Sequence, residues 1–116
     1  MNEFERGFLA SFIVAEGTFF FIKRKQKTYP CLHIYNADLS VMKYIRDILQ
    51  KEIGHLGRKP IQILEKKEKG NRLRKKKVYL IEISGKRLKT LIEKLPELEY
   101  FDKTSKSVRL IKAYEP

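Results

Sequence analysis

The stretch FLASFIVAEGTFF, residues 8–20, decides the fold. Its first half lies in a predicted helix over residues 3–16, which opens with the capping-box pair Asn2 and Glu5 and stops at Gly17. Side chains of one kind recur every four residues along this helix: aromatic Phe4, Phe8 and Phe12, aliphatic Leu9 and Ile13, and small Gly7, Ser11 and Ala15. The aromatic and aliphatic rows are typical of contacts with a protein core.

The row of small residues would let another helix approach closely. That helix can belong to the same chain, but the two apolar rows already occupy the core side and no face of the helix is clearly polar. The sequence therefore predicts that Gly7, Ser11 and Ala15 form a homodimer interface with the same helix of a second copy.

The residues beyond this stretch predict alternating strands and helices. We expect strands over 18–23 and 29–35 around a basic turn, a helix over 39–53 capped by Asp38, strands over 61–66 and 77–84, a helix over 86–95 and a short helix over 104–114. This α-β-β-α-β-β-α order, with the short last helix appended, predicts a single α+β domain over residues 1–116. Its four-stranded antiparallel sheet would carry helices on one face and leave the other face open.

The chain is strongly basic. It has 26 Lys and Arg residues against 14 Asp and Glu residues, which gives a formal net charge of +12. Nucleic acid is the expected partner, with an anionic membrane surface or an acidic protein as the weaker alternative. No apolar run approaches the ~20 residues that cross a bilayer, and the basic runs do not lie on an amphipathic helix, so we expect no membrane binding. With Cys31 as the one cysteine, the sequence predicts an intracellular protein that is not secreted.

Basic and aromatic side chains alternate along the predicted strands, which would place them on the open face of the sheet. Arg24 and Gln26 continue the phase of the first strand, and Lys77 and Tyr79 share one face of the fourth. The run 66–77 is either a solvated charged loop or a surface that follows phosphates, and a second basic turn favours the latter. The expected DNA-contacting residues are Arg24, Gln26, His33, Tyr35, Lys66, Arg72, Arg74, Lys75, Lys77 and Tyr79.

Glu16 ends the first helix, where a carboxylate is unfavourable because the last carbonyls carry partial negative charge. A hard cation would relieve this, since Mg²⁺ and Ca²⁺ prefer carboxylate and carbonyl oxygens. A single helix-terminal Glu is more often only exposed, but two copies ending side by side would bring two Glu16 carboxylates together. His33 has no second histidine at ligand spacing, so the sequence predicts no zinc site.

Residues 9–17, LASFIVAEG, resemble the LAGLIDADG motif of homing endonucleases at seven of nine positions. Ser11 and Val14 depart from the pattern: Ser11 is still small, and Val14 replaces an acid that is not the metal-binding one in this family. The resemblance implies a single-motif homodimer whose two sheets form a saddle in the major groove of double-stranded DNA. It also implies that Glu16 and the backbone carbonyl of Ala15 hold Mg²⁺, with Mn²⁺ or Ca²⁺ as substitutes.

The resemblance implies two further catalytic positions. The family places a polar residue at the end of the second strand to order water, and Asn36 stands there. It also places a lysine near the scissile phosphate, which matches Lys103, with Lys106 as the alternative. From the residues alone, Asn36 is equally a turn residue or a cap, and Lys103 a surface charge.

The function implied by the resemblance is a site-specific homing endonuclease. It would make metal-dependent double-strand breaks with 3′ overhangs in a long pseudo-palindromic DNA target, and so promote mobility of a host intron or intein. Two alternatives stay open: an intron-encoded RNA maturase, which would bind structured RNA, and a catalytically inactive DNA-binding relative. The intact Glu16 favours the nuclease.

Overall fold

The helix α1 (Glu3–Glu16) begins at the predicted capping box. In the computed structural model, which describes residues 1–67 and 77–114, the Asn2 Oδ1 atom accepts the backbone N–H of Glu5 at 2.7 Å. The Glu5 carboxylate accepts the N–H of Asn2 in return at 3.1 Å. Two of the backbone donors that a helix start leaves unpaired are thereby satisfied, which explains why the sequence located this end correctly.

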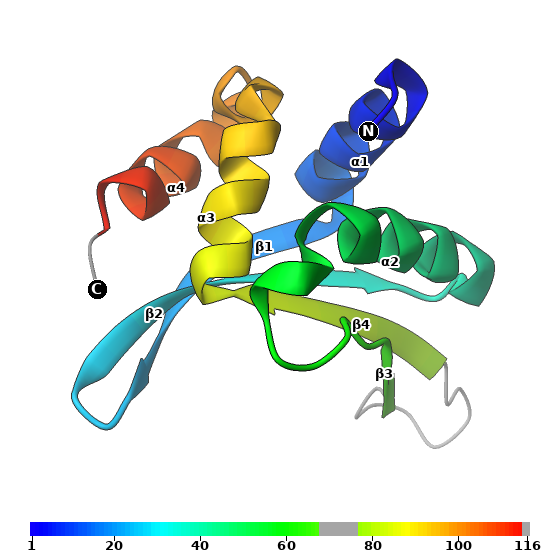
Figure 1. The fold of residues 1–116 in the computed structure, drawn as a ribbon, viewed down its shortest axis with the longest axis horizontal. Coiled ribbons are helices and arrows are strands. Elements are labelled where there is room, and N and C mark those ends of the chain that lie inside the picture. The colour runs from blue at the N-terminus through cyan, green and yellow to red at the C-terminus, as the bar shows by residue number, and fades with distance from the viewer. Residues whose placement is uncertain (68–76, 115–116) are drawn as a thin grey trace.

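The remaining elements follow in the predicted α+β order. They are β1 (Gly17–Arg24), β2 (Lys27–Asn36), α2 (Leu39–Ile53), the 3₁₀ turn η1 (Gly54–Leu56), β3 (Leu64–Lys67), β4 (Lys77–Ser84), α3 (Gly85–Lys94), the 3₁₀ turn η2 (Pro96–Glu99) and α4 (Asp102–Ala113). The four strands form one antiparallel sheet in the order β1-β2-β4-β3. All four α-helices lie on one side of this sheet, and the β1–β2 hairpin and the β3 end bend away from them at opposite ends (Figure 1).

The pairing register assigns each strand residue to one face of the sheet. Leu32 pairs with Ile83, and both are buried in the core. Every second residue of β2 and β4 counted from this pair therefore faces the helices. His33 pairs with Glu82 and points to the other, open face. By the same register Tyr79 shares the helix-covered face and packs against the core.

The predicted face of the fourth strand is therefore wrong for Lys77 and Tyr79. Pleat alternation within a strand fixes which residues share a face, but only pairing with β2 fixes which of the two faces meets the helices. Glu82, which pairs with His33, lies on the open face of β4 instead.

The β1–β2 hairpin closes more tightly than predicted. Lys25 and Gln26 form a two-residue turn with positive φ angles of 49° and 68°, the signature of a type I′ turn. Arg24 pairs with Lys27 and keeps the phase of the strand, as predicted. Gln26 lies in the turn itself and does not continue that phase.

The core between sheet and helices is almost entirely aliphatic. From α1 it receives Leu9, Ala10 and Ile13, all of which are buried. The aromatic row contributes less than predicted: Phe8 and Phe12 pack against the core, but Phe4 is 69% exposed. Within the described residues, every helix is too short or too polar to cross a bilayer.

Candidate functional site

The junction between α1 and β1 exposes the Glu16 carboxylate at the end of the helix. Gly17 makes this junction tight: a Cβ atom there would lie 2.6 Å from the carbonyl oxygen of Ile13. Its φ of −87° is ordinary, so the glycine is required by close approach and not by backbone strain. The acidic residue is thus held by a fixed turn directly above the first strand.

Lys103, near the start of α4, reaches this junction from a distant part of the chain. Its Nζ atom donates a hydrogen bond of 3.0 Å to the backbone carbonyl of Ala15. The ammonium caps a last-turn carbonyl and places a positive charge at the negative end of α1. The structure therefore brings Lys103 to the end of α1 that carries Ala15 and Glu16, although it lies 88 residues from Ala15 in sequence.

Asn36 lies at the same end of the sheet. It is two residues beyond Ile34, the β2 partner of Gly17. Its Oδ1 atom accepts the backbone N–H of Asp38 at 2.7 Å, which forms a turn before Asp38 caps α2. The Asn36 side chain thus stabilises a turn, which is the structural role that the sequence also allowed.

The donor atoms at the end of α1 fit a hard divalent cation in kind but not in number. Glu16 offers a carboxylate and Ala15 a carbonyl that is free of helical hydrogen bonding, and both are oxygens of the type that Mg²⁺ and Ca²⁺ prefer. Mg²⁺ requires octahedral coordination, so one chain supplies only part of a complete site. A second carboxylate, phosphate oxygens or water would have to complete it.

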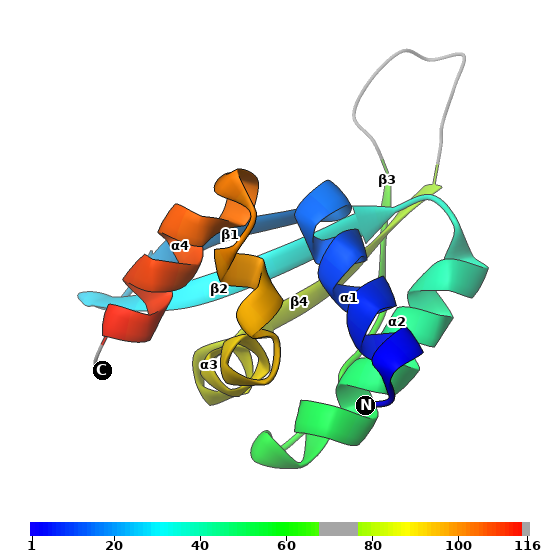
Figure 2. The same cartoon turned by 90° about the horizontal axis from the view of Figure 1, so that it is seen from above.

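The side of α1 that faces away from the core is uncovered. We call the exposed residues Phe4, Gly7, Ser11 and Ala15 the outer face of α1. A Cβ atom on Gly7 would meet nothing within 4 Å. A glycine inside a helix costs about 1 kcal/mol relative to alanine, and no contact within the described chain explains it. Seen from above, α1 runs between α2 and the η2 segment, and α4 lies farther away (Figure 2).

The centre of the open sheet face holds a polar and aromatic cluster around His33. The His33 Nε2 atom lies 2.9 Å from Glu82 Oε2, and its ring packs edge-on against Phe20 with centroids 4.6 Å apart. The Tyr35 hydroxyl lies 3.4 Å from His33 Nδ1. Burial raises the pKa of the neighbouring Cys31 thiol to about 11, with a smaller contribution from the nearby Glu82 carboxylate. The sequence did not predict that Glu82 belongs to this cluster, because only the pairing of β2 with β4 places it opposite His33.

The predicted DNA-contacting residues have different outcomes. Arg24, His33, Tyr35 and Lys66 lie on the open side by register, and Arg24, Tyr35 and Lys66 are exposed. Gln26 is exposed in the hairpin turn, while Lys77 and Tyr79 lie on the opposite side of the pleat. The predicted contacts Arg72, Arg74 and Lys75 lie outside the described residues.

Comparison with family models and with curated proteins finds no significant match. Among solved structures, the chain is similar to the LAGLIDADG meganuclease I-AabMI bound to uncleaved DNA, with 20% identity and a TM-score of 0.53 over 92% of this chain and 37% of that one. It is also similar to I-DmoI in complex with DNA and Mn, with 17% identity and a TM-score of 0.50 over 92% of this chain and 60% of that one.

These similarities confirm the predicted fold: the chain has the fold of LAGLIDADG homing endonucleases. It spans less than two thirds of the length of either protein, so it corresponds to only part of each.

Proposed function

We propose that this protein is a site-specific, metal-dependent DNA endonuclease of the LAGLIDADG family that acts as a homodimer and promotes mobility of a host intron or intein. The observation that carries the proposal is the junction at the end of α1, where Lys103 bonds the Ala15 carbonyl beside the exposed Glu16. It supports the proposal because it places a lysine at the helix end that carries Glu16, and a metal at the Ala15 carbonyl would displace the Lys103 ammonium toward a phosphate.

The outer face of α1 supports the homodimer. It is apolar or small at every position and continues up to Ala15, next to the acidic residue. Packing two copies of this face would bury Phe4 and give Gly7 the close contact that the single chain lacks. It would also bring two Glu16 carboxylates together, whose mutual repulsion favours a shared cation.

Each residue at the junction has a distinct role in this proposal. Glu16 and the Ala15 carbonyl would hold Mg²⁺ near a scissile phosphate, and a bound divalent ion supplies water activation and stabilisation of the leaving oxygen. Lys103 would neutralise charge on the phosphate. Asn36, fixed by its bond to the Asp38 N–H, would present its remaining amide group to water.

The charge and shape of the sheet support DNA as the substrate. The net charge of +12 favours a polyanion, and the arms of the sheet bend to one side, away from the helices (Figure 1). Arg24 and Lys66 lie on this side, in β1 and β3. The two solved structures of this fold described above, I-AabMI and I-DmoI, are both complexes with DNA, the partner proposed for this chain.

The test uses a plasmid that joins the two sequences flanking this open reading frame, as if the insertion were absent. With Mg²⁺ the protein should linearise it and leave 3′ overhangs, whereas Glu16→Gln should bind the plasmid without cutting. Binding without any cutting by the wild-type protein would contradict the nuclease and favour an inactive DNA-binding relative. Tighter binding to the intron transcript than to DNA would favour a maturase.

Lys103 provides a second test, with Lys106 as the matched control. Both lysines are exposed on α4, but the described contact to Ala15 belongs to Lys103. Lys103→Ala should slow cleavage by about 10²-fold at unchanged DNA affinity, whereas Lys106→Ala should change the rate by less than about threefold. Equal rates for the two variants would remove Lys103 from the catalytic proposal.

A further inference from the structure

A second group of potential ligands lies on the open face of the sheet, away from the Glu16 junction. It consists of Cys31, His33 and Glu82, whose Sγ, ring nitrogen and carboxylate oxygen atoms all lie within 4.8 Å of one another. Cys31 and His33 are alternate residues of β2, and Glu82 is the direct partner of His33 on β4. The three side chains therefore leave the two central strands of the sheet on the same face.

We propose that Cys31, His33 and Glu82 form a binding site for Zn²⁺ or a similar borderline-soft divalent cation. Thiolate, imidazole and carboxylate are the three ligand types that Zn²⁺ uses. Bond lengths of about 2.0–2.3 Å in a tetrahedral site separate the donor atoms by roughly 3.3–3.8 Å. The present separations are close to this range, because His33 Nε2 and Glu82 Oε2 are 2.9 Å apart and all three donor atoms lie within 4.8 Å of one another.

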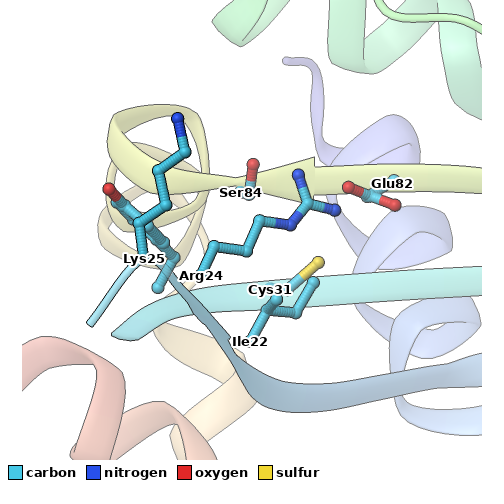
Figure 3. Close-up of a pocket in the computed structure, with 7 residues that line it drawn as sticks. Ile22, Arg24, Lys25, Cys31, Glu82 and Ser84 are labelled. Atoms are coloured by element: carbon cyan, nitrogen blue, oxygen red, sulfur yellow. The ribbon is translucent and has the colours of Figure 1, made fainter. Parts of the chain in front are cut away.

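The surroundings of the three side chains suit a metal with one open position. A pocket of about 390 Å³ lies beside them, lined by Cys31 and Glu82 among others, and leaves room for water or an anionic group as the fourth ligand (Figure 3). The Tyr35 hydroxyl lies 3.4 Å from His33 Nδ1. That contact would orient the ring so that Nε2 faces the metal, as partners of metal-bound histidines do.

Binding has defined chemical consequences at this site. The cation would replace the hydrogen bond between His33 and Glu82, and the Cys31 thiol proton would leave to solvent as the sulfur–metal bond forms. Arg24 lines the same pocket, and its exposed guanidinium would turn outward. Glu82 is the one acidic residue on the open face of the described strands, so metal binding would neutralise a carboxylate that otherwise opposes a polyanion.

The experiment titrates metal-free protein with Co²⁺ and Zn²⁺. We expect one equivalent of thiolate-bound metal per chain, seen as a cobalt–thiolate charge-transfer band in the near ultraviolet, and a Zn²⁺-dependent rise in Tm. Cys31→Ser should abolish the band, and Glu82→Gln should weaken Zn²⁺ binding by at least about tenfold. His55→Gln replaces the other histidine, which is exposed in the turn η1. This variant and Glu16→Gln should leave the cobalt band and the Zn²⁺ affinity unchanged.

Two results would overturn the proposal. One is a wild-type protein that shows neither the cobalt band nor a Tm shift with Zn²⁺. The other is Zn²⁺ binding that survives in both Cys31→Ser and Glu82→Gln, or that is lost in His55→Gln. Since Glu82 is partly exposed, its variant should remain folded even if the buried Cys31 does not tolerate replacement, and circular dichroism checks each variant. The Glu16→Gln control keeps this test separate from the nuclease.

Discussion

The two sides of α1 have very different relations to the rest of the chain. Leu9, Ala10 and Ile13 on the inner side are buried against the sheet and the other helices. Phe4, Gly7 and Ser11 on the outer side are equally free of charge but exposed. Core packing explains the residues of the inner side. On the outer side Phe4 stacks on Phe8 with ring centroids 6.0 Å apart but is still 69% exposed, and no contact within the described residues explains Gly7. In the proposed homodimer, the same helix would serve two interfaces, one within the chain and one between copies.

The largest expected effect is on the inner side. Leu9→Ala should lower the free energy of unfolding by about 2–5 kcal/mol, because it leaves a cavity in a fully buried site. Leu110→Ala is the matched control on α4, where the leucine is 53% exposed, and should cost less than about 1 kcal/mol. Urea unfolding measures both, and similar losses would show that α1 is not anchored as described.

A charge on the outer side should act on assembly and leave the fold intact. Ser11→Lys should weaken self-association by at least about a hundredfold, since two lysines would be buried against each other at the dyad. Sedimentation velocity should then detect a folded monomer of 13.8 kDa. Ser40→Lys adds the same charge at an exposed position of α2 and should remain a dimer, and a dimeric Ser11→Lys protein would rule out this interface.

Gly7→Ala distinguishes a solvent-exposed outer face from an interface. In an isolated chain the added methyl meets nothing, so helix propensity alone should raise the free energy of unfolding by about 1 kcal/mol. At an interface the same methyl separates the two helices, so the dimer dissociation constant should rise by about tenfold. Chemical unfolding of the monomeric form measures the change in stability, and sedimentation at several concentrations measures the change in the dimer dissociation constant. A stabilised Gly7→Ala protein with an unchanged dissociation constant would show that this face is exposed to solvent.

The smallest expected effect is on the pH dependence of stability, and it arises at Glu5 near the start of α1. The pKa of Glu5 is lowered below its usual 4.5, first by the backbone N–H of Asn2 and then by the Lys51 ammonium on α2. A lowered folded-state pKa contributes stability that is present above pH 4.5 and is lost as the pH falls through the folded value. Wild-type and Glu5→Gln proteins should therefore differ in urea midpoint at pH 7, and the difference should shrink as the pH falls below 4.5 through the lowered pKa of Glu5. A gap that stays constant over this range would exclude the ionic contribution.

Local signals predicted the helices and the last strand well. The bounds of α1 follow from the Asn2–Glu5 capping box, and Asp38 accepts the Val41 N–H at the predicted start of α2. The third strand begins later than predicted because Ile61 is bonded to α2: its N–H donates to Gln50 Oε1 at 2.8 Å and its carbonyl accepts Arg46 Nε at 2.9 Å. These tertiary bonds leave no periodic trace in the sequence.

The sequence predicted those parts of the candidate sites whose residues lie close together in one segment of the chain. The helix-terminal Glu16 stands in one motif with Ser11 and Ala15, and Gly7 lies just before that motif. The contact of Lys103 with Ala15 joins residues 88 positions apart, and only the resemblance pointed to it. The group of Cys31, His33 and Glu82 depends on the β2–β4 register, which also explains why the face of Tyr79 was predicted wrongly.

The central claim, that two chains contribute one Glu16 each to a single cleavage site, is tested most directly with a mixed dimer. Wild-type and Glu16→Gln chains carrying different tags would be co-expressed, purified through both tags and assayed on the joined-flank plasmid with Mg²⁺. We predict that a mixed dimer is recovered, binds the plasmid and yields no linear product. A mixed dimer that linearises the plasmid at the wild-type rate, or a failure to recover any mixed species from active wild-type protein, would contradict it.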